Sequence, residues 1–141
     1  ATYIPKLFLD GSPNIVRLFP NFKEVEQDYY QRTGIFPIMH SVVIREDVHQ
    51  EHPWAAASLY DAFTQAKDLV VDRLYDTDAL ALTLPFLIDH IEETWRIFGS
   101  DYWSYGVELN RPALEAIAQY VVDQGLAPRV VSVEELFPEI T

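Results

Sequence analysis

One apolar run, residues 35–44, constrains the fold of this chain more than any other feature. It reads IFPIMHSVVI, so that an extended backbone would send apolar side chains to both of its faces. A strand that is apolar on both faces is typical of a sheet covered by helices on both sides. Such a strand also needs neighbouring strands along its edges. The run therefore predicts a strand that is buried inside a sheet, with other strands flanking it.

The rest of the chain supplies many helices and few strands. Five helices are predicted from apolar positions that repeat near 3.6 residues and from capping residues. Their predicted ranges are 22–32, 54–75, 78–98, 110–124 and a short segment near Leu136 opened by a capping box from Ser132 to Glu135. Pro85 is expected to kink or divide the third helix. The other predicted strand, residues 15–19, is short, so the sheet must be completed by residues outside the sequence or by another copy of the chain.

Composition excludes several functions. The 141 residues carry a net charge of −12, which repels nucleic-acid backbones and anionic membranes. An anionic substrate would need a local group of Arg, Lys or His to overcome this field. Cysteine is absent, which excludes disulfides and thiolate chemistry. No apolar run approaches the ~20 residues of a membrane-spanning helix, so we expect no membrane insertion.

Three stretches of the chain resemble the 4,5-dihydroxyphthalate decarboxylase family. The most specific string is GIFPIMH, residues 34–40, and the resemblance extends from about Asn14 to Phe137. The first stretch is RLFPN (17–21) with Glu26, Tyr29 and Tyr30; the second is TGIFPIMH (33–40) with VVIR (42–45); the third is WSYG (103–106) with Asn110, Arg111, QGL (124–126) and EELF (134–137). HPW (52–54), Ala66, Lys67 and RLY (73–75) fit between them.

This resemblance implies a particular architecture. Such proteins resemble type II periplasmic-binding proteins, in which two α/β lobes enclose a ligand cleft. Full-length members are about twice as long as this chain, which would make it a C-terminal portion. Residues 1–34 would then end the second lobe, and residues 35–141 would form a crossing strand and the helical part of the first lobe. An exposed sheet edge would allow a homo-oligomer.

The resemblance also implies a binding site for a small aromatic carboxylate. His40, in the most specific string, is the predicted catalytic residue, either as proton donor or as the group that orients a phenol; its alternative is a core histidine bonded to backbone. Arg17 and Arg111 are predicted to bind carboxylates, because a guanidinium pairs with them bidentately. Trp103 and Tyr105 are predicted to stack on the ligand ring. The alternatives are exposed arginines and an aromatic loop that packs on its own domain.

No cofactor or metal is predicted. His49 and His52 have a spacing that suits one helical face, but no third ligand is evident and Pro53 interrupts the helix. His90 lies among acidic residues and is expected at the surface. The sequence shows no phosphate-binding loop, dinucleotide fingerprint or nucleophile elbow.

Two functions follow from the resemblance. The first is a cytoplasmic lyase that releases carbon dioxide from an aromatic dicarboxylate. The second is the ligand-binding component of an importer, which would be periplasmic and would catalyse nothing, because a fold does not fix a function. In either case we expect the 141 residues alone to be inactive, since half of the cleft would be missing.

Overall fold

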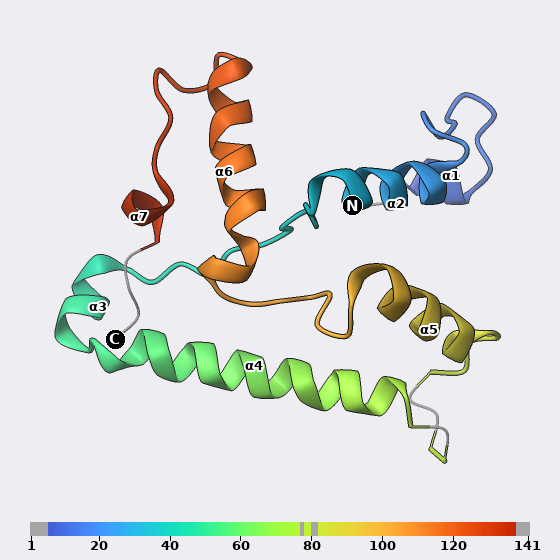
Figure 1. Ribbon diagram of the computed structural model, residues 1–141, viewed down its shortest axis with the longest axis horizontal. Coiled ribbons are helices and arrows are strands. Elements are labelled where there is room, and N and C mark those ends of the chain that lie inside the picture. Colours follow the sequence, from blue (N-terminus) through green and yellow to red (C-terminus); the bar gives the residue numbers. More distant parts are fainter. Residues whose placement is uncertain (1–5, 77, 80–81, 138–141) are drawn as a thin grey trace.

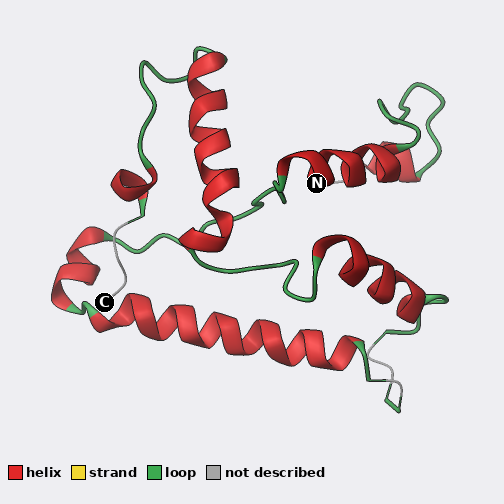
Figure 2. Cartoon of the chain, in the orientation of Figure 1, coloured by secondary structure: helices red, strands yellow, loops and turns green. Residues whose placement is uncertain are grey.

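The computed structural model describes residues 6–76, 78–79 and 82–137, and within them the chain is helical without any strand (Figures 1 and 2). Helices account for 59% of the described residues. The elements are α1 (Lys6–Leu9), α2 (Phe22–Thr33), α3 (Glu46–Glu51), α4 (Trp54–Leu74), α5 (Leu87–Phe98), α6 (Val107–Asp123) and α7 (Val133–Leu136).

The predicted α/β fold is therefore wrong for the described residues. Residues 34–45 form an irregular connection between α2 and α3, and residues 15–19 are not a strand either (Figure 2). No backbone hydrogen bond found in the described chain involves residues 36–44. The physical reason is that β-branched, apolar composition favours a strand only where a neighbouring strand pairs with its backbone. Without a sheet, the predicted oligomer through a sheet edge has no basis.

Two predicted helices are confirmed almost residue for residue. Helix α2 ends at Gly34, whose φ of 67° is left-handed and whose N–H donates to the Tyr30 carbonyl. Helix α4 covers Trp54–Leu74, within the predicted range 54–75. The capping box before α7 is also confirmed, since Ser132 accepts from the Glu135 N–H at 3.2 Å and Glu135 accepts from the Ser132 N–H at 3.1 Å.

Two other helices begin elsewhere than predicted. Helix α5 starts at Leu87, because Pro85 lies just before it and Phe86 takes a left-handed φ of 62°. Of the predicted range 78–98, residues 80 and 81 lie outside the described part. Helix α6 starts at Val107, so that Asn110 lies inside its first turn and does not cap it. The short helices α1 and α3 were not predicted.

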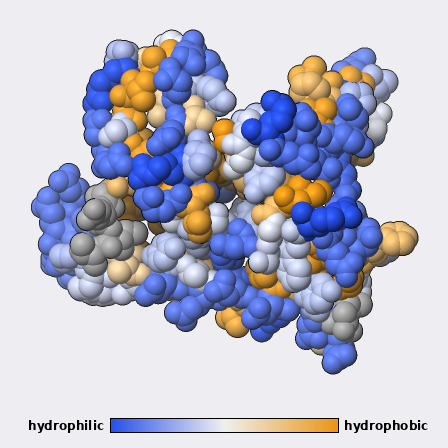
Figure 3. Space-filling model, in the orientation of Figure 1, coloured by the Kyte–Doolittle hydropathy of each residue, from blue (hydrophilic) through white to orange (hydrophobic). Residues whose placement is uncertain are grey.

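Few side chains are fully buried in this arrangement. Only Ile91, Leu114 and Val133, on α5, α6 and α7, count as core residues in the described chain. The accessible surface is 11305 Å². A compact chain of 16.3 kDa would expose roughly 7,500 Å². Figure 3 shows apolar residues at several separate places on the face that it draws. The helices therefore pack in local pairs, and much apolar surface is uncovered.

Candidate functional site

The loop between α5 and α6, residues 99–106, carries polar and aromatic side chains that contact α4, and we call it the aromatic loop. Lys67, on α4, donates from Nζ to Asp101 Oδ1 at 2.6 Å, across 34 residues of sequence. The same ammonium lies 5.2 Å from the ring centroid of Tyr105. The Lys67 side chain is only 13% exposed, whereas that of Asp101 is 54% exposed. A largely covered cation thus fastens the loop to the middle of α4.

The end of this loop is fixed by a close backbone approach and by an amide. Gly106 has φ 94° and ψ 161°, a conformation that L residues avoid. A Cβ at Gly106 would lie 3.3 Å from the Tyr60 hydroxyl oxygen, so α4 packs directly against this glycine. Asn110 Nδ2 donates to the carbonyls of Ser104 at 3.0 Å and Gly106 at 2.9 Å. These contacts hold the loop in one position at the start of α6.

Five rings from different segments meet beside the loop. We call this group the aromatic junction; it consists of Tyr30, Phe36, Phe98, Tyr102 and Trp103. Phe36 is its centre, with ring centroids 5.5 Å from Phe98, 6.5 Å from Tyr102 and 5.8 Å from Trp103. Tyr30 adds a contact of 4.7 Å to Phe98. Edge-on and tilted rings at these distances attract one another beyond simple burial. The junction joins α2, the start of the connection 34–45, α5 and the aromatic loop.

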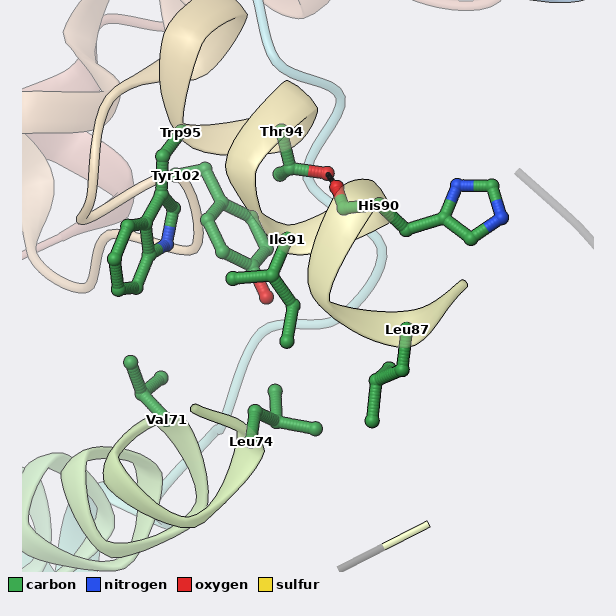
Figure 4. A pocket seen from close by; sticks show the side chains of 8 residues that line it. All are labelled: Val71, Leu74, Leu87, His90, Ile91, Thr94, Trp95 and Tyr102. Atoms are coloured by element: carbon green, nitrogen blue, oxygen red, sulfur yellow. Dashed lines mark hydrogen bonds between the residues drawn. The ribbon is translucent and has the colours of Figure 1, made fainter. Parts of the chain in front are cut away.

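A pocket of about 180 Å³ lies between α4 and α5 (Figure 4). Its lining residues are Val71, Leu74, Leu87, His90, Ile91, Thr94, Trp95 and Tyr102. The imidazole of His90 points away from the other side chains in Figure 4, and Thr94 Oγ1 donates to the His90 carbonyl at 2.7 Å. The lining contains no Lys or Arg, so this pocket offers no partner for a carboxylate.

His40 and Arg17 take no part in the loop contacts just described. His40 is exposed on the connection between α2 and α3, and its imidazole makes no hydrogen bond or ring contact with the described chain. Arg17 is exposed in the segment before α2, with its guanidinium carbon 4.2 Å from the Phe22 ring centroid and 5.0 Å from that of Phe8. Their predicted roles in catalysis and substrate binding stay predictions.

Arg111 is engaged by carboxylates of its own chain. Its guanidinium lies 2.8 Å from Glu108, 2.8 Å from Glu134 and 3.8 Å from Glu115. Hydrogen bonds to Glu108 and Glu134 raise the pKa of Arg111, and those to Arg111 lower the pKa of Glu108. The group joins α6 to α7. A substrate carboxylate would have to replace one of these partners, so the predicted role of Arg111 in substrate binding stays a prediction.

Trp103 and Tyr105 lie on the same loop, as predicted, but each has its own partner. Trp103 is 41% exposed and contacts Phe36, whereas Tyr105 is half-buried under Lys67. The sequence reasoning did not single out Lys67, Asp101 or Phe36 as site residues. The helical spacing could have indicated Lys67, because Lys67 lies one turn from Thr64 and Val71 on the face of α4 that is turned toward the loop.

The described residues contain neither a cluster of metal ligands nor a membrane-spanning helix. No group of three or more His, Asp or Glu side chains is arranged to hold a metal ion in the part of the chain that the structure describes. His52 contacts the Trp54 ring at 5.9 Å and lies 3.8 Å from Glu51. Across residues 6–76, 78–79 and 82–137, every helix is too short or too polar to cross a membrane.

Comparison with known proteins relates the chain to a decarboxylase, although no family model matches it. The relative is 4,5-dihydroxyphthalate decarboxylase from Comamonas testosteroni, to which the chain is 34% identical over 133 residues. The match covers 94% of this chain and 40% of the relative. The chain is therefore similar to this decarboxylase over nearly its whole length, and the predicted resemblance is confirmed. The division of the chain at residue 35 stays a prediction.

Proposed function

We propose that this chain is part of a decarboxylase that acts on 4,5-dihydroxyphthalate. The observation that carries the proposal is the match to a decarboxylase over 94% of the chain. Because the chain spans only 40% of that relative, the activity is proposed for a protein that contains the chain. The relative is an enzyme, and the comparison gives no support to the importer alternative.

The proposed reaction needs one proton and no electron transfer. A proton adds to the ring carbon that carries the departing carboxylate, and the phenol para to that carbon becomes keto-like. The carbon–carbon bond then breaks, its electron pair restores the aromatic ring, and the products are carbon dioxide and 3,4-dihydroxybenzoate. The site must supply a proton donor, cations for two carboxylates and a surface that excludes water.

The aromatic loop and the part of α4 that faces it offer a surface for the ring and a cation for one carboxylate. Trp103 is partly exposed and can stack on a substrate ring, while its contact with Phe36 holds the indole in place. Lys67 is a cation that is already desolvated and already bound to a carboxylate, that of Asp101. We propose that a substrate carboxylate takes the place of Asp101 at Lys67. Such a local cation is what the net charge of −12 requires of any site for an anion.

His40, Arg17 and Arg111 complete the proposal. His40 remains the proposed proton donor, because its imidazole is exposed and makes no hydrogen bond or ring contact with the described chain, so that it is free to meet a substrate. Arg17 is a proposed second carboxylate partner, since its present contacts are ring faces and not acids. Arg111 is the weaker arginine for this role, because three carboxylates surround it.

The test uses the protein encoded by the natural gene that contains this sequence. It is mixed with 4,5-dihydroxyphthalate, and 3,4-dihydroxybenzoate is followed by absorbance and confirmed by chromatography. His40→Ala is expected to lower kcat by at least about 100-fold if it is the proton donor. Trp103→Ala and Lys67→Met are expected to raise KM, since they remove binding. Val43→Ala is the control, because Val43 is 89% exposed.

Each result has a defined meaning. Absence of product from the unmodified protein would overturn the proposed activity. Turnover at the normal rate in His40→Ala would remove His40 from the mechanism while leaving the activity intact. An unchanged KM in Lys67→Met would remove Lys67 from carboxylate binding.

A further inference from the structure

The surface of helix α4 is divided into three lengthwise faces. At about 100° per residue, Tyr60, Thr64, Lys67, Val71 and Leu74 share one face. This face is turned toward the rest of the chain, as the contacts of Lys67 with Asp101, of Tyr60 with Gly106 and of Val71 and Leu74 with the α5 pocket show. The next face is acidic, with exposed Asp61, Asp68 and Asp72.

The third face is apolar and uncovered. We call it the α4 stripe; its members are Leu59, Ala62, Phe63, Ala66, Leu69 and Val70, which fall within an arc of about 120°. The exposed Arg73 lies in the same arc, near the end of the helix. Leu59 is 41% exposed, Phe63 45%, Leu69 61% and Val70 58%. In the view of Figure 1, α4 runs along one edge of the molecule with the other helices to one side. A helix with this pattern normally buries such a stripe.

We propose that the α4 stripe is the docking surface for the part of a full-length family polypeptide that this chain does not match. Length supports this occupant. The chain matches 40% of its relative, so the other 60% of that relative is long enough to pack over the α4 stripe. Area supports it as well. The accessible surface of the whole chain exceeds that of a compact chain by roughly half, an excess of the size buried in permanent interfaces, and the exposed residues of the α4 stripe contribute to it.

Charge argues against a second copy of this chain as the occupant. Each copy carries a net charge of −12, and the acidic face with Asp61, Asp68 and Asp72 borders the α4 stripe. Two stripes in contact would bring two rows of three carboxylates together, with Arg73 as the one cation that lies in the arc of each stripe. The surface fits instead an apolar face that is edged by Lys or Arg. The remaining part of the family polypeptide must therefore present such a face.

Photo-crosslinking tests the occupant directly. A photoreactive phenylalanine analogue replaces Phe63 in the natural gene product, and the same analogue replaces Gln65, on the polar side of the same helix, as a matched control. After irradiation, the crosslinked peptides are mapped by mass spectrometry, with isotope-mixed samples to separate contacts within one polypeptide from contacts between copies. We expect position 63 to crosslink to residues of the same polypeptide outside residues 1–141. The yield at position 65 should be at least about tenfold lower, because a crosslinker reacts only with what it touches.

Crosslinks from position 63 only within residues 1–141, or between copies, would overturn the proposal. So would a yield no higher than at position 65, or a gene product with nothing beyond residues 1–141. A second measurement does not depend on crosslinking chemistry. Phe63→Asp should lower the Tm of the gene product by about 5 °C, whereas Gln65→Asp, which adds the same charge to the same helix, should change it by about 1 °C or less. Equal shifts in the two variants would count against the docking surface.

Discussion

The aromatic junction and the segment that follows it, residues 38–43, are adjacent in sequence but differ in how they are held. Phe36 meets three rings that come from α5 and the aromatic loop. In the segment that follows Phe36, Ile38 is 40% exposed, Met39 is 51% exposed, Val42 is 67% exposed and Val43 is 89% exposed. Both regions are strongly apolar. The difference shows that an apolar side chain is buried only where a distant segment supplies a surface to receive it.

The largest expected effect is the removal of the central ring of the junction. Phe36→Ala should lower the free energy of unfolding by about 2 to 3 kcal/mol, because it deletes one half-buried ring and three ring contacts. Val43→Ala, a few residues away, should stay within about 0.5 kcal/mol. Urea unfolding followed by far-UV circular dichroism measures both. Equal effects would mean that the two regions are held alike.

The next largest effect on the free energy of unfolding is expected at Gly106, at the end of the loop between α5 and α6. Gly106→Ala should cost about 2 kcal/mol, since it strains a backbone at φ 94° and brings a methyl group 3.3 Å from the Tyr60 oxygen. Gly125→Ala is the matched control, because its φ is 71° and nothing lies within 4 Å of the added Cβ. That variant should cost about 1 kcal/mol. In the Tyr60→Phe background, the extra cost of Gly106→Ala over Gly125→Ala should shrink.

The Lys67–Asp101 ion pair tests whether a contact between distant segments has a larger coupling free energy than an ion pair within one helix. A double-mutant cycle with Lys67→Met and Asp101→Asn should give a coupling of about 1 kcal/mol, because the pair is partly exposed but the lysine is nearly covered. The matched pair is Arg32–Asp28 on α2, with both side chains more than half exposed at 2.9 Å. Its coupling should be about 0.3 kcal/mol. A larger coupling in α2 would contradict the view that long-range contacts hold this chain.

Local features of the sequence predicted local structure well. Gly34, the 3.6-residue pattern of residues 54–75 and the Ser132–Glu135 box each act within one or two turns, and the helices they define are present. The start of α5 after Pro85 has the same local cause, although the predicted helix began too early. The strand at residues 35–44 failed because its formation depends on partners that no local pattern describes.

The candidate site was predictable only in part, for the same reason. Trp103 and Tyr105 were singled out because they lie in one aromatic stretch of the sequence, and their role in ligand binding stays a prediction. The contacts of Phe36 with Trp103 and of Lys67 with Asp101 join segments that are tens of residues apart. Their side-chain types carry no signal of the partner. Spacing on α4 indicates which face Lys67 occupies, but not which segment covers that face.

The smallest expected effect concerns the local cap of α7, which long-range contacts do not control. The hydrogen bond from Arg129, with help from the Ser132 N–H, lowers the pKa of Glu135 from its usual 4.5 to about 2. The ionised form is therefore favoured in the folded chain, so this contribution is complete above pH 4.5 and is lost as the pH falls toward 2. Because the carboxylate is exposed, the fraying of α7 in this window should be slight.

Titration of the Glu135 carboxyl carbon by NMR measures its pKa, and Arg129→Ala should raise that pKa toward 4.5. Gln119→Ala is the control, because its amide pairs with Asp123 on α6 and does not touch this cap. An unchanged pKa in Arg129→Ala would show that the Ser132 backbone alone holds the carboxylate, and α7 would then depend on the capping box without its arginine.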